Sequence, residues 1–184
     1  MGTGYLMATG TIQFLPGAAI LPDGTTSNLP PAIQRTKSSG TAPAVYFLQL
    51  AFDAAQLEWA AWQFVMPADA NATPNPVLVI KYKMVSAVTG NVIMIGRLAT
   101  FTPGTDSTDF DAKVFAAANT SAATAVPATT AGRIGEISIT MTNADSIAAG
   151  DVCVLYVARD GASGSDTASG DLEMVEAVLT YTTA

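Results

Sequence analysis

Short segments in which apolar and polar residues alternate recur along most of the chain, and this period of two constrains the fold more than any other feature. Successive side chains of a β-strand point to opposite faces, so alternation indicates a strand with one buried face. In residues 134–142, for example, Ile137, Ile139 and Met141 are expected to point into a core. Comparable segments predict further strands at residues 5–14, 45–52, 58–66, 77–86, 91–101, 109–115, 152–158 and 172–182.

No segment shows a convincing helical stripe. The Ala- and Thr-rich residues 116–132 include Pro127 and many β-branched side chains, which disfavour a helix. The turn at Thr89-Gly90-Asn91 predicts a hairpin between the strands on either side of it. With about eight or nine strands in all, the sequence predicts an all-β, two-sheet antiparallel β-sandwich with under about a tenth of its residues in helices.

Residues 16–43 differ from the rest, because they contain five prolines together with many Gly, Ser and Thr residues. Proline lacks a backbone donor, so this segment is not expected to form a central strand. We divide the chain into an N-terminal strand and extended Pro-rich arm at 1–44 and a β-sandwich domain at 45–184. The arm is expected to be extended and ordered mainly by another chain, the alternative being a flexible loop. The candidate partner-binding residues on it are Ile20, Leu21, Leu29, Ile33, Arg35 and Lys37.

The chain contains no histidine and a single cysteine, Cys153. This composition excludes an imidazole general base, a Ser/His or Cys/His pair and a Cys/His zinc site. A single cysteine also excludes an internal disulfide. Cys153 lies in an apolar segment and is expected to be a small core residue. We therefore expect no enzyme activity, no metal and no cofactor.

Charged residues make up 12% of the chain, against about 25% in typical proteins. This low charge content predicts that part of the surface is buried against partners, foremost against other copies of the chain in a homo-oligomer. The alternative is a solvated surface of Thr, Ser and Ala residues. The net charge is −7 and the basic residues are scattered, so nucleic acid is not an expected partner. No apolar run approaches a membrane span of ~20 residues, and the N-terminus lacks the features of a secretion signal.

Two acidic loops are candidate Ca²⁺ sites. The segment TDSTDFD does not match an EF-hand, so a solvated acidic turn is the preferred interpretation. In the loop after residue 159, an ion pair between Arg159 and an Asp of that loop is preferred over an ion site. The carboxylates concerned are Asp106, Asp109 and Asp111 in the first loop and Asp160, Asp166 and Asp171 in the second.

Two further groups have a functional and a structural interpretation. Glutamates in predicted strands are candidates for glycoside hydrolysis, which nothing else in the sequence supports. Aromatic residues at nearby strand positions are candidates for a sugar-binding platform, although core packing is the preferred interpretation. These residues are Glu58, Glu173 and Glu176 in the first group and Trp59, Trp62 and Tyr82 in the second.

Four segments, 58–71, 77–101, 137–160 and 165–181, resemble tailed-bacteriophage and prophage structural proteins. The shared features are an aromatic-rich strand ending in a Pro turn and a Lys/Tyr strand followed by Gly-Asn. An Ala-Gly-Asp turn, a strand ending in Arg-Asp, and Asp-Thr before the last strand complete the pattern. It covers roughly residues 45–184 and falls on Trp62, Phe64, Pro67, Gly90, Asn91, Ala149, Gly150, Asp151, Arg159, Asp160, Asp166 and Thr167.

The resemblance implies a jelly-roll-like sandwich and a non-enzymatic virion protein, foremost a capsid decoration (cement) protein. Such a protein binds the major capsid protein on the outer capsid surface as a homotrimer, after synthesis in the host cytoplasm. A tail-associated receptor- or carbohydrate-binding module is the alternative, and an exposed Trp59 or Trp62 would favour it. A polysaccharide depolymerase is a third hypothesis, but such enzymes usually need a longer chain and clustered carboxylates.

Overall fold

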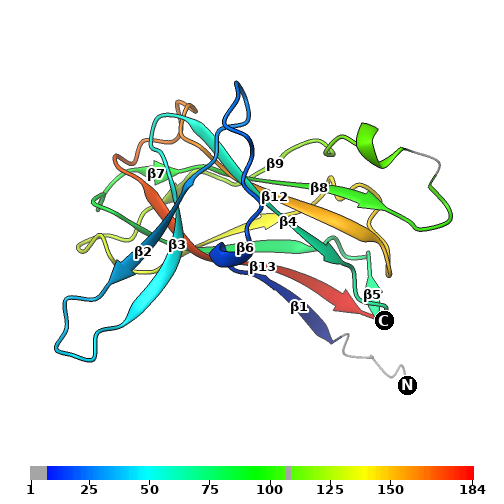
Figure 1. The fold of residues 1–184 in the computed structure, drawn as a ribbon, viewed down its shortest axis with the longest axis horizontal. Coiled ribbons are helices and arrows are strands. Elements are labelled where there is room, and N and C mark those ends of the chain that lie inside the picture. Colours follow the sequence, from blue (N-terminus) through cyan, green and yellow to red (C-terminus); the bar gives the residue numbers. More distant parts are fainter. Residues whose placement is uncertain (1–7, 107–108) are drawn as a thin grey trace, which may run out of the picture.

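The computed structural model describes residues 8–106 and 109–184, in which two main β-sheets pack face to face and two short strands form a separate two-stranded sheet (Figure 1). Within these residues the only helical elements are two short 3₁₀ turns, so the prediction of an all-β chain is confirmed. The turns are η1 (Pro16–Ala18) and η2 (Phe110–Ala112). The strands are β1 (Thr9–Phe14), β2 (Ala32–Lys37), β3 (Tyr46–Phe52), β4 (Leu57–Val65), β5 (Ala70–Asn71), β6 (Val77–Met84), β7 (Asn91–Val92), β8 (Met94–Phe101), β9 (Asn119–Thr120), β10 (Thr124–Ala125), β11 (Gly135–Thr140), β12 (Val152–Asp160) and β13 (Leu172–Thr183).

The strand order identifies a jelly roll. The larger sheet has the order β11-β6-β13-β3-β2, with β1 and β5 also paired to β13, and the smaller sheet has the order β4-β12-β8-β9. All of these strand pairs are antiparallel. From β3 to β13 the chain crosses between the sheets at nearly every connection, so that β3, β13, β6 and β11 face β4, β12, β8 and β9, the arrangement of a jelly roll. The predicted fold class is therefore confirmed.

The core lies between the two sheets and is built from the residues that alternate inward. On β11, Ile137 and Ile139 are buried, as their spacing predicts, and Met141 follows them into the core. The strand β12 is apolar on both sides, as expected for the interior of a sheet, and Cys153 and Leu155 face the core. One contiguous cluster therefore holds the sheets together.

The prediction of a hairpin around Gly90 is wrong. β6 pairs with β11 and β13 in the larger sheet, whereas β8 pairs with β12 and β9 in the smaller one. Gly90 adopts φ +93° and turns the chain from one sheet to the other. A glycine with positive φ can occur in a hairpin turn and also in a connection between two sheets. The Gly-Asn pair therefore predicts a turn, but not which strands the turn connects.

The prediction of a strand at residues 109–115 is also wrong. The structure has η2 at this place, with the Asp109 side chain accepting a hydrogen bond from the Asp111 N–H at its start. An Asp at such a position competes with strand formation, because its short side chain bonds to the nearby backbone.

The Pro-rich segment is ordered largely by its own chain. β2 pairs with β3, Ile20 forms an antiparallel bridge to Ala61 of β4, and Leu29 bridges Glu58 of the same strand. These contacts cover edges of both sheets, whose unpaired backbone groups would otherwise be exposed. The expectation that another chain orders this segment is therefore wrong for these residues, and residues 9–37 join the sandwich through their hydrogen bonds.

Candidate partner-binding surfaces

The β2–β3 hairpin carries the inner face of the larger sheet beyond the end of the core (Figure 1). Leu50 and Phe52 of β3 are fully buried in the core. Leu48 and Tyr46 lie on the same face of that strand, since side chains two and four residues apart share a face. They are nevertheless 46% and 54% exposed. At the hairpin, the face that elsewhere forms the core is therefore only partly covered, by η1 next to Leu48.

The strand β2 contributes three of the six predicted partner-binding residues to this surface. Ile33 pairs with Leu50, Arg35 with Leu48, and Lys37 with Tyr46, and directly paired residues of antiparallel strands point to the same side. We call Ile33, Arg35, Lys37, Tyr46 and Leu48 the hairpin face.

Both cations of the hairpin face are available to a partner. The Arg35 guanidinium carbon lies 5.4 Å from the centre of the Tyr46 ring. Neither Arg35 nor Lys37 forms an ion pair with any residue that the structure describes. The surface thus combines exposed apolar side chains with two uncompensated positive charges.

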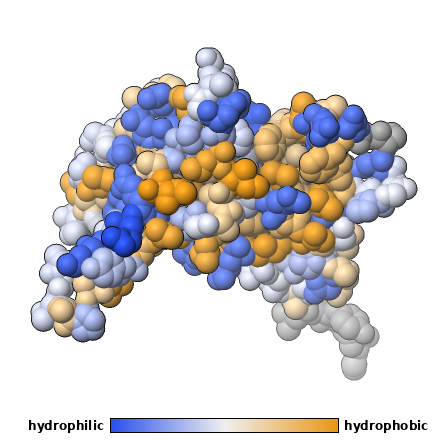
Figure 2. Space-filling model, viewed as in Figure 1, coloured by the Kyte–Doolittle hydropathy of each residue, from blue (hydrophilic) through white to orange (hydrophobic). Residues whose placement is uncertain are grey.

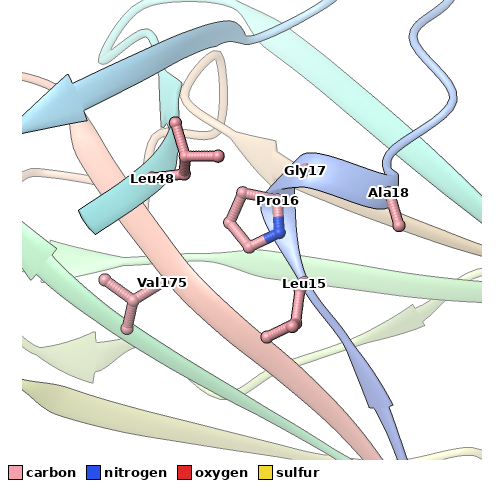
Figure 3. A pocket seen from close by; sticks show the side chains of 6 residues that line it. All are labelled: Leu15, Pro16, Gly17, Ala18, Leu48 and Val175. Atoms are coloured by element: carbon pink, nitrogen blue, oxygen red, sulfur yellow. The ribbon is translucent and has the colours of Figure 1, made fainter. Parts of the chain in front are cut away.

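An apolar cleft of about 410 Å³ lies next to the hairpin face. It opens where β13 changes its neighbour from β3 to β1, at the irregularity between Met174 and Glu176. Figure 2 shows apolar side chains gathered over the middle of this view, beside the base of the hairpin. The residues that line the cleft are Leu15, Pro16, Gly17, Ala18, Leu48 and Val175 (Figure 3).

The other three predicted residues lie elsewhere. The backbone of Ile20 exchanges two hydrogen bonds with Ala61, and the carbonyl of Leu29 accepts one from the N–H of Trp59. Ile20, Leu21 and Leu29 therefore follow the edge of the smaller sheet rather than the hairpin face. Conversely, sequence reasoning missed Leu15, Tyr46, Leu48 and Val175, because alternation does not reveal where the core ends.

The aromatic residues divide between core and surface. Trp62 and Tyr82 are buried in the core, as the preferred interpretation predicted, and the Trp62 Nε1–H donates to the Leu15 carbonyl at 3.0 Å. Trp59 instead lies on the outer face of the smaller sheet, stacked on Tyr156 with ring centres 5.0 Å apart. Trp59 thus lies outside the core between the sheets, but it is partly buried against a second apolar cluster of Ile95, Tyr156 and Ala158.

Arg159 ties down the loop before β13, as its structural interpretation predicted. Its side chain is fully buried and forms a bidentate ion pair with Asp166. The Nε–H donates to Oδ2 at 3.0 Å and an Nη2–H donates to Oδ1 at 2.8 Å. Its remaining hydrogens go to the carbonyls of Phe52, Ala168 and Gly170. Asp166 also accepts from the N–H of Ile93, which joins the loop to the residue just before β8.

Several residues that carry the phage-protein resemblance lie in two groups of turns that are joined by hydrogen bonds. Asn91 donates its N–H to the Thr167 hydroxyl and accepts from the Thr167 N–H, next to the Arg159–Asp166 pair. At the other end, the Asp151 carboxylate accepts from the Ala148 N–H, and the Gly150 N–H donates to the Met66 carbonyl. The residues of the resemblance thus have structural roles here.

The candidate catalytic glutamates are all engaged in contacts with the protein itself. Glu173 contacts Lys83 and Gln49, and Glu176 pairs with Lys81 at 2.7 Å. Glu58 accepts a hydrogen bond from the Asp53 N–H at 2.7 Å, and burial raises the pKa of its carboxyl. Glu58 belongs to the smaller sheet and the other two to the larger one.

The carboxylates of Asp106 and Asp109 accept hydrogen bonds from backbone N–H groups close to them in the chain. Asp106 accepts from the Thr102 N–H at 2.8 Å, and Asp109 caps η2. In the part of the chain that the structure describes, which leaves out residues 107–108, no three His, Cys, Asp or Glu side chains gather as a metal site.

Cys153 is buried, and burial raises the pKa of its thiol to about 12. Since the thiolate is the reactive form, we expect no reaction with a disulfide reagent such as DTNB at pH 8 in the native protein. Unfolding in urea should expose the thiol and give one equivalent of labelling. Rapid labelling of the native protein would contradict the packing described here.

No helix among the described residues is long and apolar enough to cross a membrane. No family model and no curated protein match the chain. Among solved structures, a carbohydrate-binding module specific for non-crystalline cellulose is similar at 10% identity and TM-score 0.38, covering 91% of this chain and 93% of that one.

Two further structures are similar. One comes from a study of promiscuous carbohydrate-binding modules of the β-sandwich superfamily, at 8% identity and TM-score 0.33, covering 98% of this chain and 57% of that one. The other is of infectious bursal disease virus, Gx strain, at 10% identity and TM-score 0.27, covering 98% and 52%. Likenesses at these TM-scores identify no family, and the fold assignment rests on the strand order.

Proposed function

We propose that this protein is a non-enzymatic structural component of a virion, a capsid decoration protein that binds the outer capsid surface as a homotrimer and stabilises capsomer junctions. The observation that carries the proposal is the hairpin face, where the inner side of the larger sheet continues beyond the core and is only partly covered. Jelly rolls recur in viral capsid domains, which agrees with this role at the level of the fold.

The chemistry of the hairpin face indicates what it binds. Full burial of an exposed apolar side chain contributes about 1.5–3 kcal/mol. Ile33 and Leu48 of the hairpin face, and Leu15 of the adjacent cleft, are about half exposed, so a partner that covers them adds roughly half of that for each. Arg35 and Lys37 favour an acidic rim around an apolar groove on the major capsid protein. Three such contacts made by one trimer raise its overall affinity for the capsid through avidity, without any additional kind of contact.

Substitution of Leu48 by Asp tests the proposal. A carboxylate here places a desolvated charge in the interface, so we expect at least about tenfold weaker binding to expanded capsids assembled from the major capsid protein of the same genome. The matched control is Val114→Asp, because Val114 is 77% exposed and lies outside the hairpin face. Unchanged capsid affinity of the Leu48→Asp variant would refute the role of this face.

Sedimentation equilibrium separates capsid binding from self-association. The wild type is expected at three times the chain mass of 18.8 kDa. Leu48→Asp should keep that mass, since the hairpin face is proposed to contact the capsid rather than another copy. Monomeric wild type would contradict the trimer, and a monomeric variant would reassign the hairpin face to the subunit interface.

A tail-associated receptor- or carbohydrate-binding module is the second candidate function. The observation that favours it is the position of Trp59 on the outer face of the smaller sheet, beside a second aromatic ring. Dissociation of purified virions into heads and tails, followed by detection of this chain in each fraction, distinguishes the two candidates.

A further inference from the structure

A hollow of about 430 Å³ lies on the outer face of the smaller sheet, away from the hairpin face. This volume falls in the range of small-molecule sites, about 300–1,000 Å³. Three adjacent strands supply its floor, with Trp59 from β4, Tyr156 from β12 and Arg97 from β8. Tyr156 and Arg97 are direct partners in the pairing of β12 with β8.

Aromatic rings form much of this hollow. Phe115 packs edge-on to Trp59 and to Tyr156, with ring centres 6.3 and 5.4 Å apart. Burial raises the pKa of Tyr156 to about 12, so its phenol stays neutral at physiological pH. Tyr156 is buried beneath Trp59 and Arg97, so the partly exposed Trp59 and Phe115 present the rigid, uncharged apolar surface of the hollow.

The two walls are held in place by hydrogen bonds. On one side, the Trp59 Nε1–H donates to the Ser27 carbonyl at 3.2 Å, and the Trp59 N–H donates to the Leu29 carbonyl at 2.9 Å. On the other side, the N–H of Ala116 donates to the Leu98 carbonyl at 2.8 Å and fixes the position of Phe115. The hollow is therefore formed before any ligand arrives, which lowers the entropy lost on binding.

Arg97 is the charged group of the hollow. Its guanidinium carbon lies 5.5 Å from the centre of the Tyr156 ring. Arg97 is partly exposed and forms no ion pair with any described residue, and no Asp or Glu lines the hollow. A ligand that supplies an anionic oxygen to this partly exposed guanidinium therefore gains a charge-assisted hydrogen bond that no residue lining the hollow provides.

We propose that this hollow binds a sugar residue that carries a carboxylate, with its ring against Trp59 and its carboxylate at Arg97. The C–H face of a sugar ring suits an aromatic surface. Asn28 lines the rim, where its side-chain amide donates to the Thr25 hydroxyl at 3.3 Å. The net charge of −7 repels a long polyanion. The ligand is therefore a single acidic residue among neutral sugars. This inference rests on the second candidate function, carbohydrate binding at the Trp59 surface, and does not depend on capsid binding.

A matched pair of ligands tests the site. Methyl β-D-glucuronide and methyl β-D-glucoside differ only in a carboxylate against a hydroxymethyl group. Titration of the isolated protein is followed by tryptophan fluorescence, in which Trp59 is the responsive ring because Trp62 is buried in the core. We expect saturable binding of the glucuronide with a Kd of about 1–10 mM and at least tenfold weaker binding of the glucoside.

Two variants and a control assign the effect. Arg97→Gln should abolish the preference for the glucuronide, and Trp59→Ala should abolish binding measured by calorimetry. Arg133→Gln, at an exposed arginine outside the hollow, should change neither. Equal affinity for both sugars, absence of saturable binding, or an unchanged preference in Arg97→Gln would overturn the proposal. Such a failure would leave capsid binding by the hairpin face unaffected, because the two surfaces share no residue.

Discussion

Replacement of Arg159 by Met is expected to lower the free energy of unfolding by about 3–5 kcal/mol, the cost of leaving one partner of a buried ion pair uncompensated. The Arg159 side chain is fully buried and makes five hydrogen bonds, all of which Met loses. Asp166 would keep its negative charge in the interior, and the Ala168 and Gly170 carbonyls would lose a donor. Urea denaturation measures the change.

A double variant separates the charge from the packing. Arg159→Met combined with Asp166→Leu removes both charges, so it is expected to be less destabilised than Arg159→Met alone. The matched single control is Arg133→Met, because Arg133 is exposed and only weakly bonded. It should change stability by less than about 0.5 kcal/mol. Loss of less than about 1 kcal/mol in Arg159→Met would refute the role of the pair.

Gly90→Ala is expected to lower the free energy of unfolding by about 2–5 kcal/mol, because two effects add. Gly90 has φ +93°, a conformation that strains any residue with a Cβ. A Cβ would also lie 2.8 Å from the Thr167 carbonyl oxygen and from the N and Cα of Ala168. Since those atoms are backbone, the loop that Arg159 holds would have to move.

Gly150→Ala is the matched control, since Gly150 has φ +85° but a Cβ added there would meet no atom within 4 Å beyond its chain neighbours. It should therefore show the conformational effect alone, about 1 kcal/mol. Thermal denaturation of the two variants under the same conditions gives the difference. Equal destabilisation would mean that the close approach of Gly90 to the loop adds nothing.

The strands of the core were predictable because burial on one face leaves a period of two. β6, β11 and β13 begin and end within a few residues of their predicted bounds, and Arg159 with an Asp of its loop was predicted from charge pairing at a strand end. Connectivity was not predictable at Gly90, because a turn residue does not specify which sheet the next strand joins.

The binding surfaces were only partly predictable. Ile33, Arg35 and Lys37 were identified as exposed anchors, but their arrangement depends on the pairing of β2 with Leu48 and Tyr46. A segment rich in proline gives no sign of the short strand between its prolines. The position of Trp59 outside the core depends on which face of β4 meets the larger sheet, and both faces of that strand are apolar.

Cosedimentation with expanded capsids tests the central claim most directly. The capsids are assembled from the major capsid protein of the same genome, mixed with this protein over a range of concentrations and pelleted. We predict saturable binding in multiples of three chains per capsid site, with binding reduced at least about tenfold by Leu48→Asp. Absence of the protein from the pellet at saturating concentration would contradict the assignment as a capsid decoration protein.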